Sequence, residues 1–315
     1  MKERTDLKLL FATSFSDSCY RSIRGVAQLA DRWSVDITIA HVMRSGKRTR
    51  VEVQRELDSF FAEADHYHGC RRLLLEGNPA TVIPALTRRQ HYDLVIAPCS
   101  DPVGLPRPFH SSLRSRMLSA SLAPLWTAGR FIHRVQFRPR LQTIACLINF
   151  RDTKLKHLRL AATMAFHAGA ELRLLHVIPT IDDGSVNWAC LNDDPLHPDA
   201  AITRIKEIAR DLPEVGGIDV ATGDLHREVP KLLSQCGADL LFLGEGMVIN
   251  SFAGFHRMSK TVSTSPCPVI CVDGPSARTP GWTFEMLSAA RQEGLLSAYD
   301  RVAEKNGLVA LTDAR

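Results

Sequence analysis

The sequence of 315 residues lacks long apolar runs and a strong excess of charge of either sign. No window approaches the roughly 18 consecutive apolar residues of a membrane-spanning helix, so we expect no membrane partner. The net charge is only +5, well below the charge density of a dedicated nucleic-acid binder, so no nucleic-acid partner is expected either. An apolar fraction of 45% and a charged fraction of 23% are typical of a globular protein.

Paired cysteine motifs are also missing, since none of the eight cysteines forms a CxxC pair. Their scatter through apolar segments is typical of small buried side chains in an intracellular protein. The segment "CPVIC" (267–271) has no histidines arranged to complete a zinc site, so we predict no metal. The charged N-terminus precedes an apolar stretch too short for a secretion signal, and we therefore expect a cytoplasmic location.

The common catalytic signatures are absent as well. The chain contains no Walker loop, no G-x-S-x-G elbow, no HExxH pair and no carboxylates spaced for acid–base catalysis. "RMSKT" (257–261) resembles the lysine signature of class I aminoacyl-tRNA synthetases, but the histidine motif and large catalytic fold of those enzymes have no counterpart in this sequence. We therefore predict a protein that is not an enzyme, with a slow ATPase activity as the one exception left open.

What the sequence does contain is an internal repeat. Residues 9–43 align with 144–178 without a gap, and 76–98 align with 222–244. The coinciding positions include Phe15 and Phe150, Asp17 and Asp152, His41 and His176, and Pro124 and Pro266. The chain is therefore a tandem of one module.

Each module alternates short apolar strands with amphipathic helices. Strands are predicted at 8–13, 37–43, 71–76, 93–97 and 124–128, and again at 142–148, 172–178, 217–222, 239–243 and 268–272. Helices are predicted at 18–32, 50–66, 79–90 and 110–122, and again at 153–168, 198–211, 225–236 and 254–264. Unbroken apolar strands suit a sheet covered on both faces, and the alternation predicts parallel crossovers. The predicted fold class is α/β, with two tandem doubly wound parallel-sheet (Rossmann-like) domains.

The repeat also sets the domain boundaries. We predict a first module at 1–129, a basic linker at 130–141, a second module at 142–274 and a helical C-terminal extension at 275–315. The linker is either a solvated segment or a basic patch for an acidic partner or RNA. Its arginines are Arg130, Arg134, Arg138 and Arg140. The extension carries an apolar stripe that needs a surface to cover, on this chain or on a partner.

The two modules resemble the universal stress protein family, and their duplication resembles its two-domain members. The similarity is carried by "ATSFSDS" and "CLINFRD" after the first strands, by "HV" ending the second strands, by "EGNPATVI" and "TGDLHREV", and by the closing "SPCPVICV". It covers nearly the whole chain except the linker and the extension. The resemblance implies a stress-response or regulatory protein that binds a ligand or a protein partner or self-associates. It also leads us to expect that the last strands of the two modules pair within one chain.

Nucleotide-binding members of this family hold ATP with an aspartate after strand one and a glycine loop after strand four, where backbone N–H groups reach the phosphates. Ser14 and Asn149 replace the aspartate, and each can hydrogen-bond a sugar without carrying a charge. In the first module Pro98 replaces the first loop glycine and removes a donor, so we interpret that phosphate cradle as lost.

The second module keeps more of this loop. Gly244 stands at the first glycine position, Met247 replaces the second, and Gly246 and Gly254 compensate in a shifted loop. His256 either donates to a phosphate or packs at the start of a helix. The alternative hypothesis is thus weak binding of an adenine nucleotide, ATP, in the second module only, with slow hydrolysis or nucleotide-dependent signalling. The candidate residues are Asn149, Val177, Gly244, Gly246, Gly254 and His256.

Overall fold

The computed structural model describes residues 7–30, 33–44, 46, 48–67, 69–98, 117, 123–128, 140–150, 155–179, 197–210, 212, 215–244 and 261–272. Its strands are β1 (Leu7–Thr13), β2 (Val35–Met43), β3 (Gly69–Glu76), β4 (Leu94–Ile96), β5 (Leu125–Thr127), β6 (Thr143–Leu147), β7 (Glu171–Ile178), β8 (Val215–Thr222), β9 (Leu240–Leu243) and β10 (Val269–Cys271). Its helices are α1 (Asp17–Ala30), α2 (Arg50–Ser59), the 3₁₀ helix η1 (Ala62–His66), α3 (Pro79–Gln90), α5 (Lys156–Ala168), α6 (Pro198–Ile208) and α7 (Leu225–Cys236).

Local sequence signals fix the equivalent helices α3 and α7. The Asn78 side chain accepts the N–H of Ala80 and Pro79 occupies the first helical position, so α3 begins where its free N–H groups have a partner. Asp224 caps α7 in the same way, and Gly237 ends that helix in the left-handed conformation. Both helices have the bounds that the sequence predicts.

The strands form one sheet of ten in the order β3-β2-β1-β4-β5-β10-β9-β6-β7-β8. All pairs within a module are parallel, whereas β5 and β10 pair antiparallel, with Trp126 opposite Ile270. This pairing joins the last strands of the two modules and confirms that expectation from the sequence. The chain therefore contains two parallel doubly wound modules joined by a short antiparallel seam.

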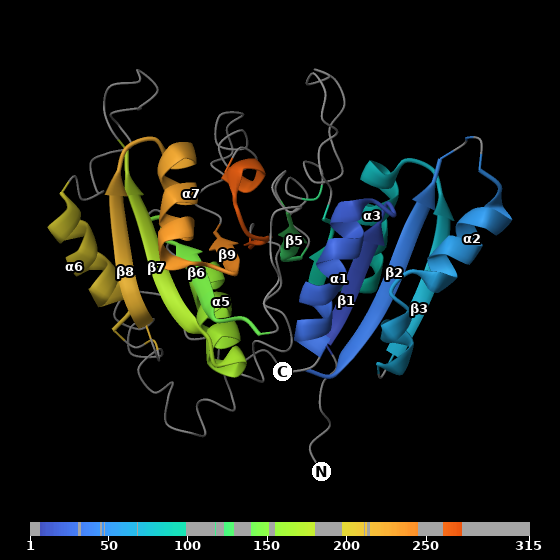
Figure 1. Ribbon diagram of the computed structural model, residues 1–315, viewed down its shortest axis with the longest axis horizontal. Coiled ribbons are helices and arrows are strands. Elements are labelled where there is room, and N and C mark those ends of the chain that lie inside the picture. The colour runs from blue at the N-terminus through green and yellow to red at the C-terminus, as the bar shows by residue number, and fades with distance from the viewer. Residues whose placement is uncertain are drawn as a thin grey trace, which may run out of the picture.

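Helices cover both faces of the sheet. One apolar cluster joins α1, α2, α5 and α6 to one face, and a second cluster joins α3 and α7 to the other. Figure 1 shows the modules side by side, with the β3–α3 turn and the β8–α7 turn on the same upper side of the molecule. Strand direction reverses at the antiparallel seam, so in a flat sheet the two carboxyl edges would point in opposite directions. The twist that accumulates from strand to strand turns both edges toward this one side. The predicted α/β fold class is confirmed.

One predicted helix is wrong in its extent. The sequence predicts an unbroken helix over 50–66, but α2 ends at Ser59 and η1 follows after two residues. Phe60 adopts an extended backbone and Phe61 a left-handed one, with φ of 54°. Both rings are buried, with Phe60 and Phe61 centroids 5.4 and 6.3 Å from that of Phe11. Burying two consecutive rings on one core face is incompatible with helical spacing, so the helix breaks there.

Several other predictions fall wholly or largely outside the described residues. These are the helices at 110–122 and 254–264, the C-terminal extension, and all of the linker arginines except Arg140. Within the described part of the chain, no helix is both long and apolar enough to cross a membrane. The six cysteines described there are all free thiols, and four of them are buried, as expected for small apolar side chains.

Candidate functional site

The strand order creates a switch point in each module. The chain runs outward from β1 to β3 and then returns to β4 on the other side of β1, and β6, β8 and β9 repeat this arrangement. Adjacent loops after such strands leave in opposite directions, so a crevice opens outside the carboxyl ends of β1 and β4 and of β6 and β9. These two edges are the candidate sites.

In the second module, three of the predicted residues come together at this edge. Leu147 of β6 lies opposite a residue of β7 on one side and of β9 on the other. Asn149, Val177 and Gly244 follow within two residues of that level, so they occupy the ends of three adjacent strands. Val177 and Gly244 are buried, and Asn149 is half-buried. Gly246, Gly254 and His256 lie outside the described residues.

A cation that sequence reasoning missed lies near this edge. Arg204 of α6 places its guanidinium carbon 4.6 Å from the centroid of the Phe150 ring, which directly follows Asn149. A guanidinium over an aromatic face is held by the ring quadrupole. In the sequence, Arg204 is only a basic residue on an amphipathic helix. The one signal that pointed to this place in the sequence was the recurrence of phenylalanine at positions 15 and 150 of the repeat.

The glycine-rich segment after β9 returns to the described structure at Thr261. The buried Thr261 hydroxyl lies 3.1 Å from Nδ1 of His226, in the first turn of α7. Asp224 caps that turn by accepting the N–H groups of His226 and Arg227. The return point of the segment is therefore anchored to the start of α7, which itself follows the carboxyl end of β8.

Local side-chain contacts hold the end of β1 at the carboxyl edge of the first module. Phe15 has a left-handed φ of 57°, and its N–H donates to Oγ1 of Thr13 at 3.0 Å. This backbone lays the Phe15 ring on His41, with centroids 4.3 Å apart and planes 19° apart. Ser14, the residue in the aspartate position, donates its N–H to the buried thiol of Cys19 at 3.4 Å. The equivalent rings of the second module, Phe150 and His176, lie 4.5 Å apart, so a phenylalanine packs on a histidine at both edges.

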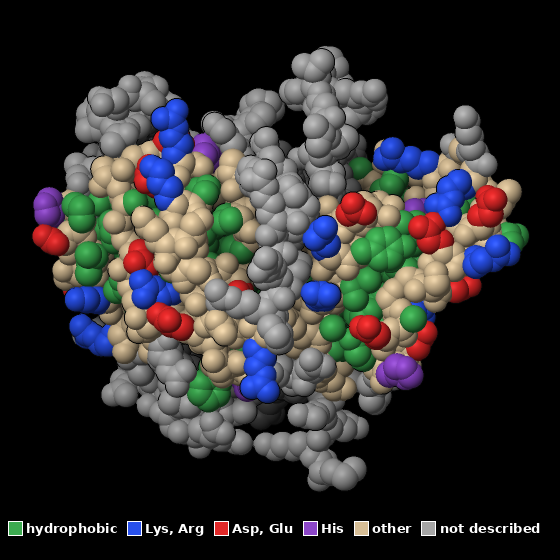
Figure 2. Space-filling view, viewed as in Figure 1, with side chains coloured by type: hydrophobic (Ala, Val, Ile, Leu, Met, Phe, Trp, Pro, Cys, Tyr) green, Lys and Arg blue, Asp and Glu red, His purple; other side chains and the backbone are tan. Residues whose placement is uncertain are grey.

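Aromatic side chains extend from this edge toward solvent. Tyr20 of α1 is 45% exposed and packs edge-on against Phe60, with centroids 5.0 Å apart. On the face shown in Figure 2, apolar side chains gather over the first module between α1 and α2, while charges of both signs are interspersed over both modules.

The two repeated histidines have matching structural roles. His41 donates from Nδ1 to the carbonyl of Thr13 at 2.9 Å, and His176 donates from Nδ1 to that of Ile148 at 3.0 Å. Burial lowers the pKa of His41, and the hydrogen bond to Thr13 opposes this shift. Each imidazole ties the end of the second strand to the end of the first. This geometry gives both histidines a structural role.

Among the described residues, no group of His, Cys, Asp or Glu side chains is arranged to hold a metal ion. Asp17 begins α1, where a carboxylate stabilises the N-terminal end of the helix. Its repeat equivalent, Asp152, lies outside the described residues.

The fold can now be compared with solved structures. A universal stress protein from Archaeoglobus fulgidus DSM 4304 is 15% identical, with a TM-score of 0.59 over 85% of this chain and 99% of its own. A putative universal stress protein from Pseudomonas aeruginosa UCBPP-PA14 is 12% identical, with a TM-score of 0.58 over 90% and 98%. A protein of unknown function from Pseudomonas aeruginosa PAO1 is 12% identical, with a TM-score of 0.59 over 92% and 98%.

These matches extend across both modules, since each covers more than four fifths of the chain. The tandem doubly wound architecture is therefore that of universal stress proteins. No family model and no curated protein sequence matches the chain. The resemblance predicted from the sequence is confirmed at the level of the fold.

Proposed function

We propose that this protein is a non-catalytic regulatory protein of the stress-response type, which acts by binding a ligand or a partner at the carboxyl edge of its second module. The observation that carries the proposal is the meeting of Asn149, Val177 and Gly244 at the ends of three adjacent strands. The Asn149 amide can hydrogen-bond a ligand. The buried Val177 side chain and the Gly244 backbone give the ligand a surface to pack against.

The same groups favour recognition over catalysis. An asparagine amide donates and accepts hydrogen bonds, but it does not exchange protons near neutral pH. General acid–base catalysis needs a titrating group within reach of the substrate, and a valine methyl or a glycine backbone cannot supply one. The role we propose for this edge is therefore to bind and to report binding.

A second candidate function is binding of an adenine nucleotide at this edge, with slow hydrolysis or nucleotide-dependent signalling. Arg204 favours it, because a guanidinium near the edge attracts a phosphorylated ligand. The first module supports it less, since Pro98 stands there at the position of Gly244 and offers no N–H to a phosphate. One nucleotide for each chain is therefore the expected stoichiometry.

Thermal denaturation with ATP and Mg²⁺ tests this candidate. At a ligand concentration ten times Kd, binding stabilises the folded state by about 1.4 kcal/mol. For a protein of this size class, that corresponds to a rise in Tm of about 3–6 °C. Isothermal titration calorimetry should give one site for each chain.

A matched pair of variants assigns the rise to the second module. Gly244→Asp places a carboxylate at the end of β9 and should abolish the rise by repelling the phosphates. Pro98→Asp makes the same change after β4 of the first module and should leave the rise intact. The Tm without ligand is measured for both variants, so that a loss of folding is recognised.

The absence of any Tm shift with millimolar ATP and Mg²⁺ would remove the nucleotide candidate. The broader proposal is tested separately, by native mass spectrometry of protein purified without added nucleotide. A bound small molecule that disappears in Asn149→Leu would support ligand binding at this edge. The same molecule retained by Asn149→Leu would place the ligand elsewhere.

A further inference from the structure

A cavity of about 300 Å³ lies where the two modules meet. Its walls come from α1 and β5 of the first module, and from the C-terminal end of α7 and the residues that precede β6, β9 and β10 in the second. Helices of a doubly wound sheet run antiparallel to its strands, so the last turns of α1 and α7 lie at the amino edge. The cavity therefore lies at the amino edge of the sheet, away from the two carboxyl edges where the candidate sites lie.

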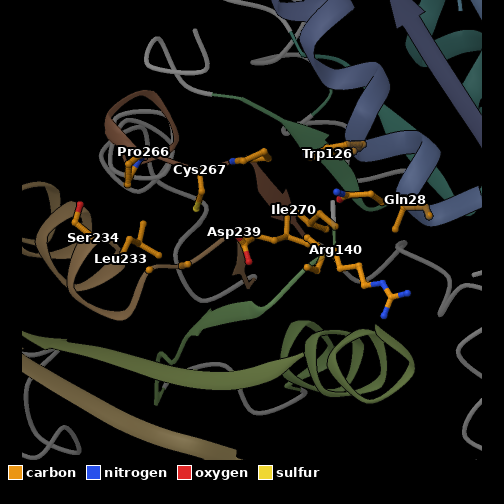
Figure 3. A pocket seen from close by; sticks show the side chains of 16 residues that line it. Gln28, Trp126, Arg140, Leu233, Ser234, Asp239, Pro266, Cys267 and Ile270 are labelled. Carbon is orange, nitrogen blue, oxygen red and sulfur yellow. The ribbon is translucent and has the colours of Figure 1, made fainter. Parts of the chain in front are cut away.

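The lining of the cavity combines apolar side chains with a few polar ones. Trp126 and Ile270, a register pair across the seam, contribute apolar surface. Figure 3 shows Gln28 and Arg140 at one end, and Leu233 and Ser234 of α7 at the other. Small-molecule sites of about 300–1,000 Å³ combine apolar walls with a few polar groups in this way.

Arg140 makes the cavity favour a negatively charged ligand. Its side chain is exposed and makes no ion pair with any residue in the described part of the chain. Asp239 also lines the cavity, but its Oδ2 accepts the N–H groups of Gln142 and Thr143 at 2.8 and 3.0 Å. Those two bonds direct the carboxylate toward the backbone before β6. An acid placed at the Arg140 end therefore meets a guanidinium that is available for pairing.

We propose that this cavity binds a small planar aromatic acid, with its ring packed against Trp126 and Ile270 and its carboxylate or sulfonate paired with Arg140. Indole and naphthalene rings stack well against tryptophan and pack against a branched aliphatic side chain. An Arg–carboxylate pair adds two parallel hydrogen bonds. Because both modules contribute walls, the site exists only in the assembled tandem.

The test uses 2-naphthoate as the probe, with binding followed by saturation-transfer NMR on the full chain. We expect saturable binding with one site for each chain. Arg140→Gln should weaken 2-naphthoate by about tenfold, while the neutral analogue 2-naphthalenemethanol should bind both proteins equally. Absence of saturable binding at millimolar 2-naphthoate, or an Arg140→Gln variant that binds as tightly as the parent, would overturn the proposal.

A matched pair on α7 locates the site. Ser234 and Gln235 are neighbouring exposed residues, but only Ser234 lines the cavity. Ser234→Trp should fill the α7 end and lower affinity at least tenfold, whereas Gln235→Trp should change it by less than twofold. Equal losses in the two variants would overturn the assignment. ATP should not displace the probe, and displacement would show that the probe occupies the nucleotide edge instead.

Discussion

Replacing Trp126 with alanine should weaken both the core and the seam between the modules. Trp126 is only 5% exposed and lies in β5, a strand of three residues. It faces Ile270 across the only antiparallel pair that the described residues form. The seam contains just three register pairs, so this one side chain makes up a large part of the contact between the modules.

The size of the effect follows from the area buried. A buried tryptophan removes about 150–250 Å² from water, which at about 25 cal/mol per Å² corresponds to roughly 4–6 kcal/mol as an upper bound. Trp-to-Ala replacements in cores cost about 3–5 kcal/mol. We therefore expect Trp126→Ala to lower the free energy of unfolding by about 4 kcal/mol. A loss of this size is a large fraction of the stability of a typical domain.

Urea denaturation followed by far-UV circular dichroism measures the change. Phe11→Ala is the matched control, because Phe11 is equally buried but lies in β1, away from the seam. Both variants should lose similar stability, but only Trp126→Ala should unfold in two steps, each with about half the m-value of the parent, since each step exposes one module. A cost below about 1 kcal/mol, or a single transition like that of Phe11→Ala, would refute the reasoning.

Two further predictions concern ionisable side chains. Burial lowers the pKa of His41 below 6.5, so its stabilising contribution is present above pH 6.5 and is lost as the pH falls through that value toward the folded pKa. His41→Gln should flatten the decline in stability between about pH 7 and 5 when urea titrations of the variant and the parent are compared. Asp219→Asn breaks the two-pronged pair with Arg173, in which both side chains are about a quarter exposed, and should cost about 1–2 kcal/mol. Glu171→Gln removes a single contact of Arg173 at a 45% exposed carboxylate and should cost less than about 0.5 kcal/mol in thermal denaturation.

Each of these two has a contradicting result. Parallel pH profiles for the parent and His41→Gln would mean that the imidazole titrates alike in the folded and unfolded chains. Equal losses in Asp219→Asn and Glu171→Gln would mean that solvent screens both contacts of Arg173 to the same extent.

The repeat predicts the fold well because the strands and helices assigned in one module must also fit the aligned sequence of the other. Strand ends such as His41 and His176 occur at the same register in both modules, so an error in one would have broken the alignment. The pairing of the last strands was expected from the family resemblance, and it gives each apolar edge strand a partner. The ends of α2 do not follow, because two core-facing rings override a continuous helical pattern.

The candidate site could be predicted only in part. The family resemblance indicates Asn149, Val177 and Gly244, and they meet because strand ends converge where a parallel sheet changes winding direction. Arg204 could not be found in this way, since its position over Phe150 depends on how α6 packs. The cavity was hidden for the same reason, because its walls come from segments of both modules that no local pattern relates.

The twist of the sheet has a consequence for avidity. Because it turns the carboxyl edges of both modules toward the same side, one rigid partner surface can contact both modules at once. Once such a partner is held at the second module, its effective concentration at the first rises to the millimolar range, as for two sites joined by a short tether. Weak contacts to the carboxyl edge of the first module would then strengthen the complex.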